Sequence, residues 1–278
     1  MKITFLGTGT SYGVPFVGCD CAVCTSTNPR NQRLRASIFI ETSSTRLLID
    51  TTPDLRQQLL RENIRDFSAV LWTHWHNDHI IGLDDLRPIS DRVGYLQGFA
   101  DEKTVENLRR TFGYALDETR ENGGVPRLKL RVAAPLETFE IGDISVTPIP
   151  IWHGKTLIYA YRLETEENGE HRVLVYATDC SQIPDASREM IKNADVLVLD
   201  ALRHKPHPTH FSVGEALREI ENLQPRRAFL THIAHDLDCE IDNAKLPPNV
   251  QLAYDGLKVE IQPRKRTEST EKESSTRS

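Results

Sequence analysis

The chain has 278 residues, of which 38% are hydrophobic and 27% charged, and its formal net charge is −6. This length allows a large core, and the composition is typical of globular proteins. No run of 18 apolar residues occurs and the charge is acidic, so we expect no membrane partner and no broad nucleic-acid surface. The opening MKITFLGTGT lacks the features of a signal peptide and predicts a buried strand, which favours a cytoplasmic location.

Short apolar runs rich in β-branched and aromatic residues recur along the chain and predict strands. In chain order they are residues 3–7, 36–41, 46–51, 69–74, 144–151, 158–164, 172–179, 196–202, 227–232 and 252–261. Between them, helical patterns occupy residues 55–63, 101–112, 183–194 and 212–223. Ser212 and Glu215 have the spacing of a capping box, which predicts that the last helix begins there.

The order of these elements predicts the fold class. Strands come first in each half of the chain and helices follow, which indicates two packed sheets with helices outside. We therefore predict an α/β protein with an αββα four-layer sandwich over residues 1–262. Residues 263–278 are polar and charged without large apolar side chains, and predict a disordered tail.

The strongest functional signal is a run of four possible metal ligands directly after a predicted strand: His74, His76, Asp78 and His79. Four ligands within six residues cannot all face one ion, but a turn can divide them between two neighbouring ions. Imidazole and carboxylate ligands suit zinc, manganese or iron. Three further candidates also end predicted strands: His153, Asp179 and His232. The sequence thus predicts a metal site at one rim of the sandwich.

Three crowded cysteines, Cys19, Cys21 and Cys24, form a second candidate site. Cysteines two residues apart are awkwardly placed to bridge each other, and the expected compartment is reducing, so metal binding is favoured over disulfides. A closed tetrahedral zinc needs a fourth ligand. We assign His235, which can turn away from His232, and keep Cys239 as the rival. Cys180, the remaining cysteine, is expected in the core.

The histidine motif, followed by His153, Asp179 and His232, resembles the metallo-β-lactamase superfamily over about residues 1–262. This resemblance implies two catalytic divalent ions, zinc or manganese, and a bridging hydroxide as nucleophile. It assigns His74, His76 and His153 to one ion, Asp78, His79 and His232 to the other, and Asp179 to both. Asp50 matches an early acidic position that would orient the metal loop; the less favoured alternative is a helix or turn cap.

The early CxCxxC, the HxxH within the later THIAHDLD, the closing YDGLKVEI and the strand-end PIPIWH resemble the phosphoribosyl 1,2-cyclic phosphate phosphodiesterase family of the carbon–phosphorus lyase pathway. The resemblance implies a small phosphorylated substrate, a homodimer, and a lid-like insertion over residues 95–127. It also implies that Asp78 and His210 are catalytic, with His210 assisting the leaving oxygen or binding a phosphoryl oxygen. His204 and His207 are expected to be loop histidines, although either could share the role of His210.

Two other functions remain as alternatives. The first is an RNA 3′-processing endonuclease resembling ribonuclease Z, although the sequence has no long Gly/Pro-rich arm to grip transfer RNA. The second is a metal-binding module without turnover, which the full ligand set disfavours. Lactam or thioester hydrolysis is a further enzyme alternative, because the same pair of metal ions can activate water against a carbonyl carbon.

Overall fold

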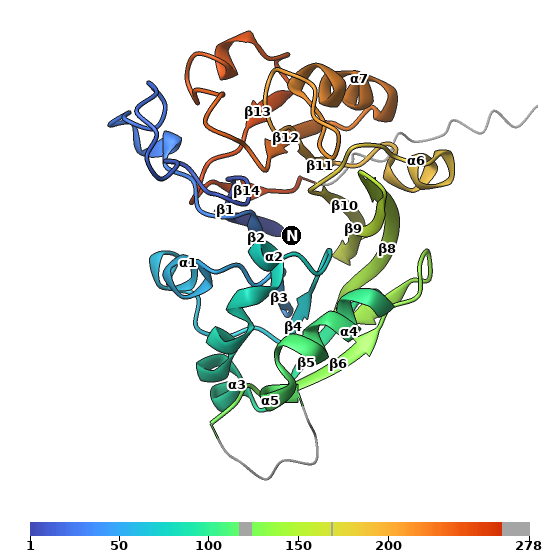
Figure 1. Cartoon of the computed structure of the whole chain (residues 1–278). Coiled ribbons are helices and arrows are strands. Elements are labelled where there is room, and N and C mark those ends of the chain that lie inside the picture. The colour runs from blue at the N-terminus through green and yellow to red at the C-terminus, as the bar shows by residue number, and fades with distance from the viewer. Residues whose placement is uncertain (117–123, 168, 263–278) are drawn as a thin grey trace, which may run out of the picture.

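The computed structural model describes residues 1–116, 124–167 and 169–262, which form two sheets flanked by helices (Figure 1). The predicted αββα sandwich is thereby confirmed. The predicted disordered tail, residues 263–278, lies outside the described residues. Within the described part of the chain, no helix is long and apolar enough to cross a bilayer.

Each sheet has seven strands. The first has the order β14 (Lys258–Glu260), β1 (Lys2–Gly7), β2 (Ser37–Glu41), β3 (Arg46–Ile49), β4 (Ala69–Leu71), β5 (Leu96–Ala100) and β6 (Leu128–Val132). The second has the order β7 (Phe139–Ile141), β8 (Ile144–His153), β9 (Thr156–Glu167), β10 (Glu170–Ala177), β11 (Val196–Asp200), β12 (Arg227–Thr231) and β13 (Val250–Leu252). In both orders, three antiparallel pairings are followed by three parallel ones.

Helices cover the outer faces of both sheets (Figure 1). The α-helices are α1 (Leu55–Arg61), α2 (Asn77–Ile80), α3 (Arg87–Val93), α4 (Glu102–Thr111), α5 (Gly113–Leu116), α6 (Asp185–Ile191) and α7 (Val213–Leu223). Short 3₁₀ turns occur at η1 (Pro29–Asn31), η2 (Ile81–Leu86) and η3 (Asn243–Lys245). Helix α7 begins with the predicted capping box between Ser212 and Glu215.

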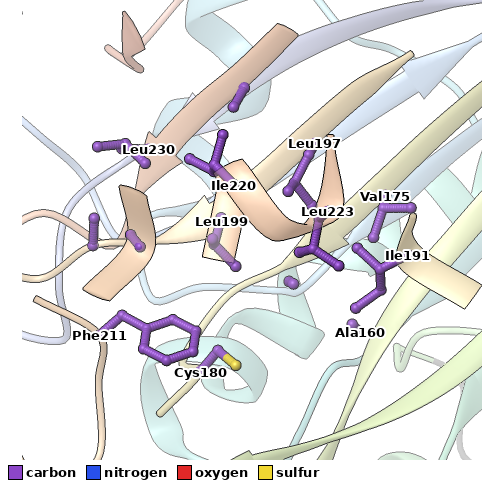
Figure 2. Packing of buried hydrophobic residues seen from close by; sticks show 14 of the residues in the cluster. Ala160, Val175, Cys180, Ile191, Leu197, Leu199, Phe211, Ile220, Leu223 and Leu230 are labelled. Atoms are coloured by element: carbon purple, nitrogen blue, oxygen red, sulfur yellow. The ribbon is translucent and has the colours of Figure 1, made fainter. Parts of the chain in front are cut away.

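Three apolar clusters hold these layers together. The inner faces of the two sheets meet in one cluster, where for example Phe5 of β1 lies 5.6 Å from Phe229 of β12. A second cluster joins the first sheet to α1, η2, α3 and α4. In the third, Ile220 and Leu223 of α7 cover Leu197 and other residues of the second sheet (Figure 2). Full burial of each such side chain contributes about 1.5–3 kcal/mol, so the sheets and helices are held in fixed relative positions.

Two expectations about the elements were wrong. Residues 252–261 are not one strand, because the chain turns at Gly256, with φ of 84°, between β13 of the second sheet and β14 of the first. Residues 95–127 are not simply a lid, since β5 pairs with β4 and β6 inside the first sheet, and α4 packs Val105 and Leu108 into its outer cluster. Residues 117–123 of this segment lie outside the described residues.

The turn between β13 and β14 carries a buried carboxylate that fixes the loop after β1. Asp255 accepts hydrogen bonds from the Thr8 hydroxyl and from the Leu34 backbone N–H, both at 2.8 Å. The buried guanidinium of Arg33 also donates to Thr8, at 2.8 Å. Thr8 in turn accepts from the backbone N–H of Ile233, next to the predicted ligand His232. This network therefore connects the sheet-switching turn to the rim of the candidate site.

Burial raises the pKa of Asp255 to about 6, although its hydrogen bonds and Arg61 oppose the shift. The folded protein therefore retains this proton over a pH range in which the unfolded chain has lost it, and folding is weakened as pH rises from about 4 to 6. We predict that wild type loses up to about 3 kcal/mol of unfolding free energy relative to Asp255→Asn across this range. Urea unfolding of both proteins at several pH values measures this difference. A wild type that instead gains stability relative to the variant would contradict the assignment.

Candidate metal centre

The candidate ligands lie where strands of both sheets end. His74 and His76 follow β4, and His153 is the last residue of β8. Asp179 follows β10, and His232 follows β12. Since β4 and β12 are parallel to both of their neighbours and β10 is parallel to β11, their carboxyl ends meet at one edge of the sandwich. The structure therefore brings the strand-end residues to one rim, as the sequence predicted.

The donor atoms form two groups, each with its atoms within 4.8 Å of one another. The first group consists of His74, His76 and His153. The second consists of Asp78, His79, Asp179 and His232. The geometry thus separates the histidine motif into two pairs of neighbours, because α2 begins at Asn77 and turns Asp78 and His79 away from His76.

Asp179 lies between the two groups. Its carboxylate is 3.2 Å from Nε2 of both His79 and His232, and 4.0 Å from Nε2 of His74. Asp78 lies on the other side of the second group, 3.2 Å from His79 Nε2. The Nε2 atoms of His79 and His232 are buried without a hydrogen-bond partner among the described residues. Buried nitrogen atoms that converge with carboxylates in this way fit a divalent cation.

Backbone conformation directs several of these side chains. Asp50, Asp179 and His232 have φ values of 67°, 54° and 58°, in the left-handed region that costs non-glycine residues roughly 1–3 kcal/mol. Asp50 accepts hydrogen bonds from the N–H and the hydroxyl of Thr73, each at 2.8 Å. It also lies 2.8 Å from His79 Nδ1, which fixes the tautomer with Nε2 facing Asp179. The side chain of Asp50 thus holds the loop that carries the candidate ligands and orients the His79 ring.

Electrostatics distinguish the two groups. Burial lowers the pKa of His74, His76 and His153, so these rings are neutral and keep a lone pair for a metal. Burial also raises the pKa of Asp78 and Asp179, but the adjacent imidazoles outweigh it and hold both pKa values well below the usual range. The second group therefore contains ionised carboxylates in a buried position, which a cation would neutralise.

The sequence-predicted His210 lies beside both groups. Its ring is 4.7 Å from the ring of His153 and 4.7 Å from that of His232. Its Nδ1 is 2.9 Å from the fully buried carboxylate of Asp200, which also accepts from the backbone N–H of Cys180. Burial alone would lower the pKa of His210, but Asp200 outweighs it and raises that pKa to about 9.

The sequence analysis did not identify Asp200 as a site residue. Its carboxylate orients His210 and comes within 4.0 Å of His232 Nδ1, so it touches the ring of one ligand as well as the candidate proton donor. One signal was available, since Asp200 ends the strand VLVLD just as Asp50 ends RLLID. The adjacent His153 is fixed similarly, because its Nδ1 is 2.8 Å from the carbonyl oxygen of Thr209.

The other two loop histidines lie further from the donor groups. His204 is exposed, with its Nε2 3.1 Å from Asp242. His207 is half-buried, and its ring lies 5.2 Å from that of His210. Its Nδ1 is occupied by the Thr209 hydroxyl at 3.1 Å. Of these two, therefore, His207 has the position from which it could share the role of His210.

The cysteine cluster forms a separate donor group with Cys19, Cys21, Cys24 and His235. The three sulfur atoms lie 3.2, 3.6 and 3.4 Å from His235 Nδ1. Cys239, the rival fourth ligand, is not part of this group, since its chain is turned toward Asn31, whose side-chain oxygen accepts from the Cys239 N–H. Cys180 is fully buried in the core beside Phe211, as predicted (Figure 2).

The chain resembles known proteins in both sequence and fold. A model of the β-lactamase superfamily domain matches residues 45–233. A solved structure described as a new diphosphatase from the PhnP family is 42% identical, covers 94% of this chain and 98% of its own, and has a TM-score of 0.85.

Two relatives that are similar in sequence carry different functional names. An octanoyltransferase of Porphyromonas gingivalis is 36% identical over 266 residues, 94% of this chain and 52% of that protein, so the chain spans about half the length of this relative. A ribonuclease Z of Methanopyrus kandleri is 25% identical over 291 residues, which are 88% of this chain and 96% of that protein. The chain therefore belongs to the metallo-β-lactamase superfamily of metal-dependent hydrolases and, within it, to the PhnP family.

Proposed function

We propose that this hydrolase cleaves a small phosphodiester, such as a phosphoribosyl cyclic phosphate, at the two donor groups. The observation that carries the proposal is the His210–Asp200 pair directly beside those groups. Cleavage of a phosphodiester produces an alkoxide that needs a proton, and an imidazolium held by a carboxylate can supply one. The likeness to a PhnP-family diphosphatase, 42% identical, supports phosphoryl chemistry over carbonyl chemistry.

Two divalent cations, zinc or manganese, would be held by the two groups. His74, His76 and His153 would bind one, Asp78, His79 and His232 the other, and Asp179 would contact both. Such ions lower the pKa of a bound water and neutralise charge that develops on a phosphoryl oxygen. The chain itself would contribute orientation: Asp50 holds the His79 ring, and the Thr209 carbonyl holds that of His153.

The catalytic side chains of the proposal are Asp78 and His210. Asp78 comes within 3.2 Å of His79 and 3.7 Å of His232, where it can bind a cation and accept a hydrogen bond from an attacking water. His210 binds Asp200 through Nδ1, so its Nε2 can donate a proton to the leaving oxygen. The cysteine group would bind one structural zinc and hold the N-terminal loop against residues 232–235.

RNA 3′ processing is the second candidate, supported by the likeness to ribonuclease Z. A direct competition separates the two functions: the metal-loaded protein is given a small cyclic phosphate and a precursor transfer RNA at several salt concentrations. Cleavage of the RNA with salt-sensitive affinity would favour the second candidate. Hydrolysis of the cyclic phosphate alone supports the first.

Metal removal is expected to abolish hydrolysis of a ribose 1,2-cyclic phosphate 5-phosphate, followed by phosphorus NMR, and added manganese or zinc to restore it. In Asp78→Ala, we expect a loss of at least about 10³-fold in kcat that added metal does not restore, because a proposed ligand is missing. His171→Ala is the matched control, since His171 is exposed and its ring pairs with Glu164 away from both donor groups. Full activity of Asp78→Ala would contradict the ligand assignment.

Cys24→Ser is expected to lower the bound zinc by about one ion per chain, because a closed zinc site needs all four ligands. Elemental analysis of the purified protein measures this directly, without reference to activity. Cys239→Ser is the control and should retain the full zinc content, since Cys239 lies outside the cysteine group. Unchanged metal in Cys24→Ser would show that these cysteines bind no zinc.

His210→Ala is expected to lower kcat on the ribose cyclic phosphate by about 10²–10³-fold, because an alkoxide leaves poorly without a proton. On bis(p-nitrophenyl) phosphate the loss of kcat should be much smaller, because nitrophenolate is a stable leaving group that needs no proton. Steady-state kinetics on both substrates, with the metal content checked, measures the difference. Equal losses on the two substrates would rule out proton donation by His210.

A further inference from the structure

Helix α4 places a lysine over the tryptophan in the middle of the histidine motif. Nζ of Lys103 lies 4.8 Å from the centre of the Trp75 ring. The same ring makes an edge contact with His76, with 4.7 Å between ring centres. Trp75 lies between His74 and His76 in sequence, so it belongs to the same loop as two members of the first donor group. A positive charge is thus held one aromatic ring away from the first donor group.

The charge of Lys103 has no ion-pair partner among the residues that the structure describes. The neighbouring carboxylate of Asp101 is engaged by the backbone N–H and the hydroxyl of Thr104, where it caps α4. Glu102, the next residue, is exposed and forms no ion pair within the described ranges. The interaction of an exposed lysine with an aromatic ring is weak, so the ammonium group can leave the ring for a full negative charge.

Trp75 supplies a second donor without an acceptor. Its Nε1 is buried and has no hydrogen-bond partner within the described part of the chain. Buried N–H groups in folded proteins are almost always paired, so an unpaired one beside an active site calls for a partner that binds there. An anionic oxygen satisfies both requirements, because it accepts from an indole N–H and attracts an ammonium group.

We propose that Lys103 and Trp75 form a subsite for a second anionic group of the substrate, attached away from the phosphorus that reacts. This inference rests on the proposed phosphodiesterase function and adds a specificity determinant to it. The subsite favours substrates that carry an additional phosphate or carboxylate over simple diesters. When such a group binds, the ammonium group of Lys103 moves from the face of the ring to the anion.

A matched pair of substrates tests the subsite: thymidine 5′-(p-nitrophenyl phosphate) with and without a 3′-phosphate. Both release nitrophenolate from the same diester, so they differ by one anionic group. We expect the metal-loaded wild type to prefer the phosphorylated compound in kcat/KM, chiefly through KM. In Lys103→Met this preference should fall by about threefold to tenfold, as for one exposed charge interaction, while kcat/KM for the simple diester stays the same.

Three further variants sharpen the test. Lys103→Arg keeps the charge and should retain most of the preference. Trp75→Phe keeps the ring but removes the N–H, and should lower the preference with bound metal unchanged. Arg109→Met removes an equal charge from an exposed position of the same helix and should change nothing. The preference of the wild type should also weaken as salt is raised, because the charge is exposed.

The outcomes distinguish a failure of the subsite from a failure of the proposed function. An equal preference in wild type, Lys103→Met and Arg109→Met, or no preference in wild type, would overturn the subsite and leave the phosphodiesterase function standing. No hydrolysis of either compound by protein with its metals bound would overturn both the proposed function and the subsite.

Discussion

The contact between Asp179 and imidazoles from both sheets is the interaction on which the candidate site depends. Asp179 follows β10 of the second sheet, whereas His74 and His79 come from the loop after β4 of the first. These groups meet because the inner faces of the sheets pack through a continuous apolar cluster that fixes their spacing. A carboxylate that is 2% exposed stays ionised because of these neighbours, so packing and charge depend on each other.

The two sheets also share a structural plan that explains where the carboxylates lie. In each sheet, three antiparallel pairings are followed by three parallel ones, and the first strand of the parallel set is β3 in one and β10 in the other. Asp50 follows β3 and Asp179 follows β10, and both have positive φ. Each strained residue directs a carboxylate toward the centre of the rim, where Asp50 orients the His79 ring and Asp179 contacts both donor groups. The strain is offset by hydrogen bonds such as those from Thr73 to Asp50.

A short segment links the two donor regions of the protein. His232 belongs to the second donor group and His235, three residues later, to the cysteine group. Figure 1 shows the N-terminal loop beside the C-terminal segment that follows β12, and the ring of Phe16 stacks on His235 at 4.5 Å. Ile233 exchanges backbone hydrogen bonds with Thr8 and Thr10. The loop that carries the cysteines is therefore held against the segment that carries His232.

The sequence by itself determined the class of fold, the approximate bounds of most of the strands and helices that it predicted, and the identity of the clustered candidate ligands. It could do so because short apolar runs, the Ser212 capping box and the strand-end histidines are local patterns. Each of them reflects the backbone geometry of a single strand or helix. Only the tertiary structure decided which residues meet across the sheets. It excluded Cys239 from the cysteine group, divided residues 252–261 between two sheets, and made β5 an interior strand of the first sheet. It also revealed Asp200 beneath His210 and the Lys103–Trp75 pair, because contacts between segments distant in sequence depend on packing that no local pattern specifies.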